Sequence, residues 1–480
     1  MELKDKKLSE DWLALWLGLA IFILSLGIFI GIDLLGWSAK TNVWISIEQS
    51  TKSISETYSQ LSPIISIFLT FVFMIVIMTI GAKALNLDIK KFLFSFTVVF
   101  LISYISWLLG HYAYIAATPD KLDKYGISWS LNLTGEAGYI IALLAGLIVG
   151  NFMPGFSKFL NEATKPELYI KTAIVIMGAA LGVKAAESAT LASAVLFRGL
   201  CAIIEAYLIY WALVYYIARK YFKFSKEWAA PLASGISICG VSAAIATGGA
   251  IRSRPIIPIM VSSLVVIFAV VELLLLPFLA QTFLYNEPLV AGAWMGLAVK
   301  TDGAAVASGA ITDGLIRAKA LAETGVAYKE GWILMTATTV KVFIDVFIGI
   351  WAFILAYIWT AKINKSKSGE KPSAKEIWDR FPKFVIGYAL TFIIFLIICL
   401  SFPEAIKMAK VASEEGNVFR QLFFVMTFFT IGVVSNFKKL WEEGIGKLAA
   451  IYILCLFGFI IWIGLLISWI FFHGAKPPVL

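Results

Sequence analysis

Charged residues, histidine and cysteine are all scarce in this sequence. Only 15% of its 480 residues are Asp, Glu, Lys or Arg, against about 25% in a typical soluble domain. Its two histidines are too few for a multi-histidine metal or haem centre. The four cysteines lie inside apolar runs without CxxC spacing, so we expect free thiols and no metal site. No catalytic constellation is visible, and we expect neither an enzyme nor a cofactor.

Apolar residues make up 60% of the chain. Runs near 20 apolar residues, the length that crosses a bilayer, occur at about thirteen places: 12–35, 64–85, 92–116, 137–156, 169–187, 193–218, 228–250, 255–282, 288–310, 332–360, 384–402, 419–436 and 448–472. The first run is too long for a signal peptide. We therefore predict an all-α, polytopic membrane protein with about 13 membrane segments.

Basic residues gather in short loops between these runs, so the net charge of +9 indicates membrane topology rather than nucleic-acid binding. If the N-terminus is cytoplasmic, all of the basic clusters lie on the cytoplasmic side of the membrane. They are Lys4–Lys7, Lys83–Lys91, Arg219–Lys226, Lys362–Lys383 and Lys438–Lys439. We expect a multi-pass protein of the plasma (inner) membrane with a cytoplasmic N-terminus.

Two apolar segments near the middle of the chain are interrupted by glycines and polar residues. They are Gly235–Ala246 and Gly296–Gly309. Inside a bilayer, irregular backbone persists only where protein or water satisfies its polar groups. Paired broken helices indicate the substrate site of a secondary transporter. Whether these segments cross or re-enter stays open, although Arg252 and Arg254 favour re-entry of the first.

The first segment predicts an anion site. Ser237, Cys239, Gly240 and Ser242 interrupt the apolar run, and a helix restarting at Val241 would direct free N–H groups into the protein interior. Such a helix start, with two nearby hydroxyls, suits an oxyanion. The alternative is that the small residues only allow close helix packing.

The second segment contains Lys300, Thr301, Asp302 and Gly303. A lysine and an aspartate at membrane depth cost several kcal/mol unless they pair or face water, so they indicate function. Lys300 could neutralise an anionic substrate, and Asp302 could orient Lys300 or exchange a coupling proton. The alternative is a structural salt bridge.

Four further ionisable residues lie inside apolar runs: Glu205, Glu272, Lys341 and Asp345. Glu205 is near the middle of its span, and Lys341 and Asp345 have the i, i+4 spacing of a helical ion pair. We expect Asp302, Glu205, Lys341 and Asp345 to handle a coupling ion. Glu272 is interpreted as part of a packed helix face.

The pattern divides the chain into four parts: extra spans at 1–136 for scaffold or oligomer contact, a first transporter half at 137–361, a cytoplasmic linker at 362–383 and final spans at 384–480. The peptides Ile176–Lys184 and Thr430–Lys438 carry glycine and lysine at equal offsets. Their opposite expected directions fit an inverted-topology repeat.

About two thirds of the chain resembles the YeiH-like sulfate exporter family. The matching pieces are Ile141–Asn151, Ala173–Gly182, Gly235–Ala246, Gly296–Gly309, Phe384–Ala389 and Thr430–Gly432. The resemblance implies an inverted-repeat transporter with crossed broken helices, and the family's name implies export of sulfate- or sulfonate-like anions.

The sequence departs from the family pattern at three places. Lys300 and Thr301 stand where the family has His and an acidic residue, Ile344 stands where Arg is expected after Lys341, and the N-terminal region is extended. We expect a secondary active transporter of a small anion, coupled to H⁺ or Na⁺ by alternating access. A monovalent cation/proton antiporter is the alternative, and a homodimer is left open.

Overall fold

The computed structural model describes residues 9–117, 121–131, 133–254, 256–359, 378, 381–435 and 446–480. In this described part, nine helices are long and apolar enough to cross a membrane, or ten if one sharply bent pair counts as a span. The all-α, multi-pass membrane fold is therefore confirmed. The count of thirteen stays a prediction.

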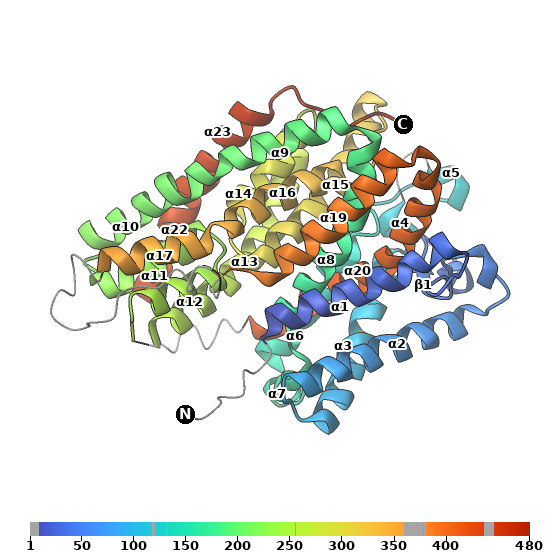
Figure 1. Cartoon of the computed structure of the whole chain (residues 1–480), viewed down its shortest axis with the longest axis horizontal. Coiled ribbons are helices and arrows are strands. Elements are labelled where there is room, and N and C mark those ends of the chain that lie inside the picture. Colours follow the sequence, from blue (N-terminus) through green and yellow to red (C-terminus); the bar gives the residue numbers. More distant parts are fainter. Residues whose placement is uncertain are drawn as a thin grey trace. The chain divides into compact units, whose positions relative to one another are not determined.

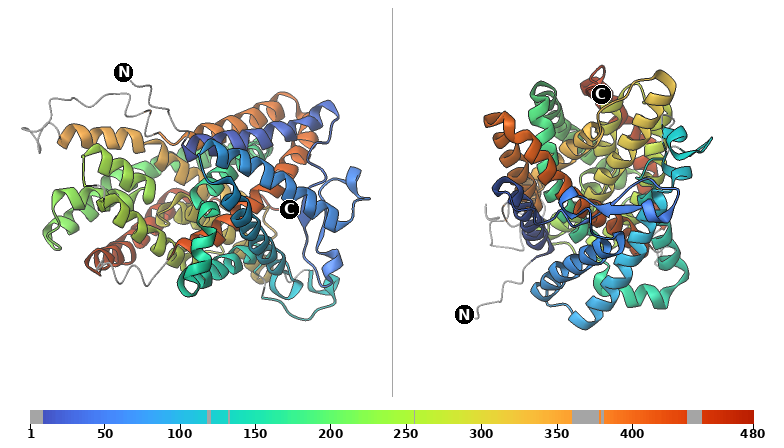
Figure 2. Two further views of the ribbon diagram at one scale, coloured as in Figure 1. Left: turned by 90° about the horizontal axis from the view of Figure 1, so that it is seen from below. Right: turned by 90° about the vertical axis from the view of Figure 1, so that its right-hand side faces the viewer.

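The chain divides into two compact units. Figure 1 labels their helices, and Figure 2 gives two further views of the ribbon. Unit 1 comprises Met1–Ala192 and Lys383–Val434, and unit 2 comprises Ser193–Pro382 and Ser435–Leu480. Both interrupted segments belong to unit 2. Most of the predicted linker at 362–383 lies outside the described residues, and the four-part division of the chain stays a prediction.

Unit 1 is a helical bundle with a small β-hairpin. Its main elements are α1 (Glu10–Ser25), β1 (Ala39–Thr41), β2 (Thr51–Ser53), α2 (Pro63–Ala84), α3 (Ile89–Gly110), α6 (Ala137–Phe152), α7 (Pro154–Leu160), α8 (Pro166–Glu187), α19 (Lys383–Ser401) and α20 (Ile406–Val434). The short elements are η1 (Leu26–Ile30), η2 (Ile47–Gln49), η3 (Glu56–Tyr58), α4 (Ala113–Ala116), α5 (Leu122–Tyr125), η5 (Asn161–Ala163) and η8 (Pro403–Ala405). Strands β1 and β2 pair antiparallel, with Lys40 opposite Lys52.

Helix α8 lies at the centre of unit 1 and packs against α1, α19 and α20. Small residues allow the close approach, since a Cβ at Gly178 would lie 2.2 Å from Thr391 Oγ1 and one at Gly182 would lie 2.3 Å from Phe392 O. This is the spacing of small residues that brings membrane helices together.

Helix α6 ends earlier than the predicted fourth span, 137–156. It stops at Phe152, and the helix that follows from Pro154 turns by 117°. Pro154 has no N–H to donate to the preceding turn, and it disfavours helical geometry at Met153. The helix therefore breaks there, and α7 begins with proline at its first position.

Unit 2 holds the interrupted helices. Its elements are the part of α9 (Ala189–Ile204) from Ser193 on, η6 (Glu205–Tyr210), α10 (Trp211–Lys220), α11 (Lys226–Ser237), α12 (Val241–Ala250), α13 (Ile256–Phe283), α14 (Pro288–Ala298), α15 (Asp302–Thr324), α16 (Trp332–Val346), α17 (Ile348–Ile358), α22 (Gly446–Cys455), η9 (Leu456–Ile460) and α23 (Ile461–Phe472). Helices α14, α15 and α16 lie side by side (Figure 1). The two discontinuous helices, α11–α12 and α14–α15, are found where the sequence predicts them.

Each interrupted helix packs against a helix that directly follows a π-helical segment. Helix α11 packs on α10, which follows η6, and α14 packs on α23, which follows η9. Tyr210 at the end of η6 donates a hydrogen bond to the carbonyl of Ile460 at the end of η9 (3.1 Å). The two peptides on which the predicted inverted repeat rests begin on α8 and α20 of unit 1, and residues 436–438 of the second lie outside the described chain.

Candidate functional site

The first break is made by a glycine backbone that other residues rarely adopt. Helix α11 ends at Ser237, and Gly240 has φ 71° and ψ −111° before α12 begins at Val241. A Cβ at Gly240 would lie 2.5 Å from Val265 Cγ1 and 3.0 Å from the carbonyl oxygen of Lys300. Glycine is therefore required both by backbone conformation and by close approach to the second break.

The second break is an extended stretch from Val299 to Thr301. Helix α14 ends at Ala298, and the Thr301 side chain accepts a hydrogen bond from the N–H of Ala304 (3.1 Å), which caps the start of α15. Asp302 is thus the first residue of α15, where a negative charge faces the positive end of the helix dipole. The two breaks contact each other, as the sequence predicted.

Lys341, on the intact helix α16, joins the two breaks. Its Nζ donates hydrogen bonds to the carbonyl oxygens of Ile238 (2.8 Å), Val299 (3.3 Å) and Lys300 (3.4 Å). These carbonyls belong to the C-terminal ends of α11 and α14, where helix dipoles are negative. The lysine is 1% exposed, so its charge is offset by protein groups rather than by water.

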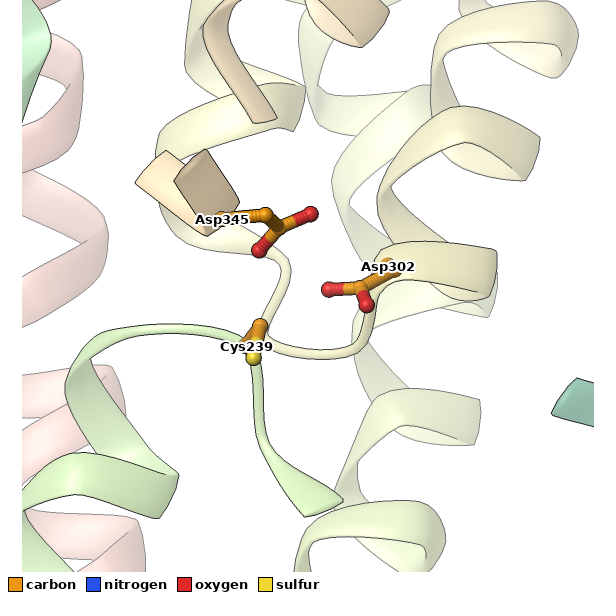
Figure 3. A group of neighbouring side chains, drawn as sticks. All are labelled: Cys239, Asp302 and Asp345. Carbon is orange, nitrogen blue, oxygen red and sulfur yellow. The ribbon is translucent and has the colours of Figure 1, made fainter. Parts of the chain in front are cut away.

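Two aspartates and a thiol lie close to one another at the breaks (Figure 3). Cys239 Sγ and one carboxylate oxygen each of Asp302 and Asp345 lie within 4.8 Å of one another, and all three residues are buried. Asp302 Oδ1 is 4.0 Å from Lys341 Nζ. The cluster thus combines two carboxylates, one thiol and one ammonium group. Its oxygen and sulfur atoms could hold a proton or a small cation.

Cys239 lies in the short stretch between the end of α11 at Ser237 and the start of α12 at Val241. The predicted site residues Val241 and Ser242 follow in the first turn of α12, both partly exposed. Ser237 is fully buried, and its hydroxyl has no hydrogen-bond partner in the described part of the chain.

Lys300 is held on a different side of the crossing. Its Nζ donates to the carbonyl of Leu297 and lies 4.5 Å from the centre of the Tyr210 ring. Its backbone N–H donates to Glu272 Oε2 (2.8 Å), and Tyr452 OH donates to the other oxygen of Glu272 (3.4 Å). Lys300 is 1% exposed.

Glu272 is the site residue whose role the sequence did not reveal. It was assigned to a packed helix face, and it is indeed fully buried on α13, but it also satisfies an N–H that the second break frees. The available signal was its position inside an apolar run, where an acid is expensive. Nothing in the sequence links it to Lys300, 28 residues away.

The structure brings together most of the predicted site. Thr301, Asp302 and Gly303 form the second break and the first turn after it, and Lys341 and Asp345 reach the same place from α16. Asp302 has an ion pair with Lys341. The side chain of Glu205 lies outside the described set, so its role stays a prediction.

Comparison with known proteins identifies the family to which this chain belongs. The model of the family described as conserved hypothetical protein 698 matches residues 96–451. A UPF0324 membrane protein of Nitrosomonas europaea is 43% identical over 98% of this chain and 97% of its own length. A UPF0324 membrane protein of Nitratidesulfovibrio vulgaris is 27% identical over 92% of this chain and 69% of its own length.

An uncharacterized protein of Archaeoglobus fulgidus is 49% identical over 30% of this chain and 88% of its own length. No solved structure matches. The chain belongs to the UPF0324 membrane protein family, which is the YeiH-like family that its motifs indicated.

Proposed function

We propose that this protein is a secondary active transporter whose binding centre is the crossing of its two broken helices. The observation that carries the proposal is the position of Lys341, which binds carbonyls of both breaks and forms an ion pair with Asp302. A buried charge network at interrupted helices is costly for a scaffold. It is the arrangement expected where charged solutes bind within a membrane.

The coupling ion is the role that Asp302 and Asp345 support best. A proton or Na⁺ arriving at these carboxylates would compete with the Lys341 ammonium for Asp302. When the ion leaves, Lys341 would again neutralise Asp302. The network thus has two charge-balanced arrangements, and alternating access could follow from which one is occupied.

For the cargo we propose a small anion, with sulfate- or sulfonate-like oxyanions first. The support is the pair of helix starts at Val241 and Asp302 and the second buried cation, Lys300. The Ser237 hydroxyl adds to it, since it has no hydrogen-bond partner among the described residues. Helix starts favour anions. Because two carboxylates stand nearby, the anion would enter only with Asp302 or Asp345 neutralised by the coupling ion, which makes the coupling obligatory.

One observation favours a second candidate, a monovalent cation/proton antiporter. The thiol and carboxylates of Cys239, Asp302 and Asp345 converge within 4.8 Å and could themselves be the cation site. In that case Lys341, rather than the predicted Lys300, would compete with the cation. Anion flux separates the two candidates, because the antiporter needs none.

Flux into proteoliposomes tests the proposal. Purified protein would be assayed with radiolabelled sulfate and a radiolabelled alkyl sulfonate, each driven by a pH gradient or a Na⁺ gradient. We expect gradient-driven anion uptake that is lost in Asp302→Asn and Lys341→Gln. Lys319→Gln is the matched control, since this lysine lies on α15 against the Tyr285 ring and away from the break.

Cation/H⁺ exchange without anion movement would support the antiporter instead. Equal flux in Asp302→Asn, Lys341→Gln and the control would refute the assignment of the site.

We propose that the protein lies in the plasma membrane with a cytoplasmic N-terminus, and the positions of the basic loops support this orientation. Labelling of engineered cysteines at Lys40 and Lys90 from either side of sealed vesicles would check the orientation.

A further inference from the structure

Unit 1 has a basic groove that plays no part in the proposed transport site. It lies where the start of α3 meets α7 and η5, and its volume is about 680 Å³. This falls in the range of about 300–1,000 Å³ that small-molecule sites occupy. The groove is lined by side chains that include Lys90, Lys91, Lys158, Phe94, Phe159 and Glu162.

The charge of the groove is positive. Lys91 is 3.3 Å from Asp88 and so is partly neutralised. In the described part of the chain neither Lys90 nor Lys158 has an ion-pair partner, and both are exposed. Glu162 opposes them with one negative charge. The excess of lysine attracts an anion, and a phosphodiester is one that a membrane supplies.

Exposed aromatic side chains and a sharp bend surround this groove. Helix α7 and the turn after it make an angle of 117° with α6, so they lie across the direction of a spanning helix. Phe152 is 79% exposed, Phe94 69% and Phe159 47%. Lys158 and the exposed Phe159 share the bent segment α7, and a segment with lysine and aromatic side chains outside the spanning direction is typical of a membrane interface.

We propose that this groove binds the headgroup of an anionic phospholipid. Lys90 and Lys158 would contact the phosphate, and the rings of Phe94 and Phe159 would contact the upper acyl carbons. A zwitterionic lipid carries its own ammonium group, which the lysines would repel. The groove would thus select lipids by charge, and this selection is independent of the cargo and of the ion at the crossing.

Lipid selectivity tests the proposal. The full chain would be reconstituted in phosphatidylcholine with spin-labelled phosphatidylglycerol or spin-labelled phosphatidylcholine, and the motionally restricted fraction measured. We expect a preference for phosphatidylglycerol that falls about thirtyfold in Lys90→Gln/Lys158→Gln, since each of the two lysines contributes about 1 kcal/mol near a membrane surface and about 1.4 kcal/mol corresponds to tenfold. Lys158→Arg should keep the preference.

Lys40→Gln/Lys52→Gln is the matched control, because it removes two lysines from the β1–β2 hairpin of the same unit. Phe159→Gln should lower retention of both lipids while the lysines remain. Equal selectivity in the groove variant and the control would overturn the proposal. Release of the labelled lipid by inorganic phosphate at low concentration would also overturn it, because the groove would then be a site for the free ion.

Discussion

Lys341 Nζ lies 4.0 Å from Asp302 Oδ1, and both side chains are almost completely buried. Removing one member of a buried ion pair leaves the other charge uncompensated, at a cost of about 3–5 kcal/mol. We therefore expect Lys341→Met to lower the thermal stability of the purified protein strongly. Asp302→Asn should cost less, since Lys341 keeps its three carbonyl acceptors.

The double variant Lys341→Met/Asp302→Asn separates charge pairing from packing. If the pair is coupled, the double variant should be more stable than the sum of the two single changes predicts. Fluorescence-detected melting of all four proteins measures the coupling. If the stability losses of the two single variants simply add in the double variant, Lys341 stabilises only the carbonyl ends of α11 and α14 and not Asp302.

Gly240 should tolerate substitution less well than other glycines with positive φ. Gly240→Ala adds a strained backbone and a Cβ 2.5 Å from Val265 Cγ1 and 3.0 Å from the carbonyl oxygen of Lys300. Gly325, with φ 68°, has open space around its Cβ position and is the matched control. Strain at positive φ costs about 1–3 kcal/mol.

We expect Gly325→Ala to lower the melting temperature slightly and leave flux unchanged. Gly240→Ala should lower both, because the added methyl group pushes the two breaks apart. If both variants behave alike in melting and in flux, the close contact between the breaks is not important for function.

Glu272 should stabilise the second break through one oxygen. In Glu272→Ala the N–H of Lys300 loses its 2.8 Å acceptor, and an unsatisfied buried donor costs about 1–3 kcal/mol. Glu272→Gln keeps an acceptor at this place and should recover most of the loss. Tyr452→Phe removes only the 3.4 Å contact to the other oxygen and is the control.

Amide exchange at Lys300, followed by mass spectrometry of the peptide that spans the break, reports this role directly. Exchange should be fast in Glu272→Ala and slow in Glu272→Gln and Tyr452→Phe. Fast exchange in Glu272→Gln would mean that the negative charge, rather than the acceptor, holds the break.

The sequence predicted the breaks because glycine and polar residues are conspicuous inside an apolar run. Asp302, Lys341 and Asp345 were predicted for a similar reason, since each is an isolated charge at membrane depth. The sequence did not show which of these charged residues form ion pairs with each other. The i, i+4 spacing suggests Lys341 with Asp345, but it does not reveal Asp302, with which Lys341 forms an ion pair from α16 to the start of α15.

Apart from the meeting of the two breaks, contacts between distant segments were beyond the sequence. The assembly of unit 1 from residues 1–192 and 383–434 depends on close packing of α8 with α19, and no periodic pattern identifies that partner. The β1–β2 hairpin was not expected either, because its strands are three residues long and polar. Local chemistry and the contact between the breaks were thus predictable, and the other tertiary partners were not.

His111 should make unit 1 sensitive to acid. It follows α3, its Nδ1 is 2.8 Å from the carbonyl oxygen of Trp107, and its Nε2 faces Gly135 so closely that an added Cβ there would be 2.3 Å away. Burial lowers its pKa from 6.5 to about 4. The neutral ring is therefore favoured in the folded state.

Between pH 6.5 and 4 the unfolded chain binds a proton that the folded chain does not, so stability falls as the pH falls through this window. The neutral His111 ring thus makes the free energy of unfolding higher above pH 6.5 than below pH 4, by an amount on the order of 3 kcal/mol. Melting followed by tryptophan fluorescence should show a steeper loss of stability in the native protein than in His111→Gln. His473→Gln, which removes the exposed second imidazole, should retain the native slope. If His111→Gln loses stability with falling pH as steeply as the native protein, another group causes the acid sensitivity.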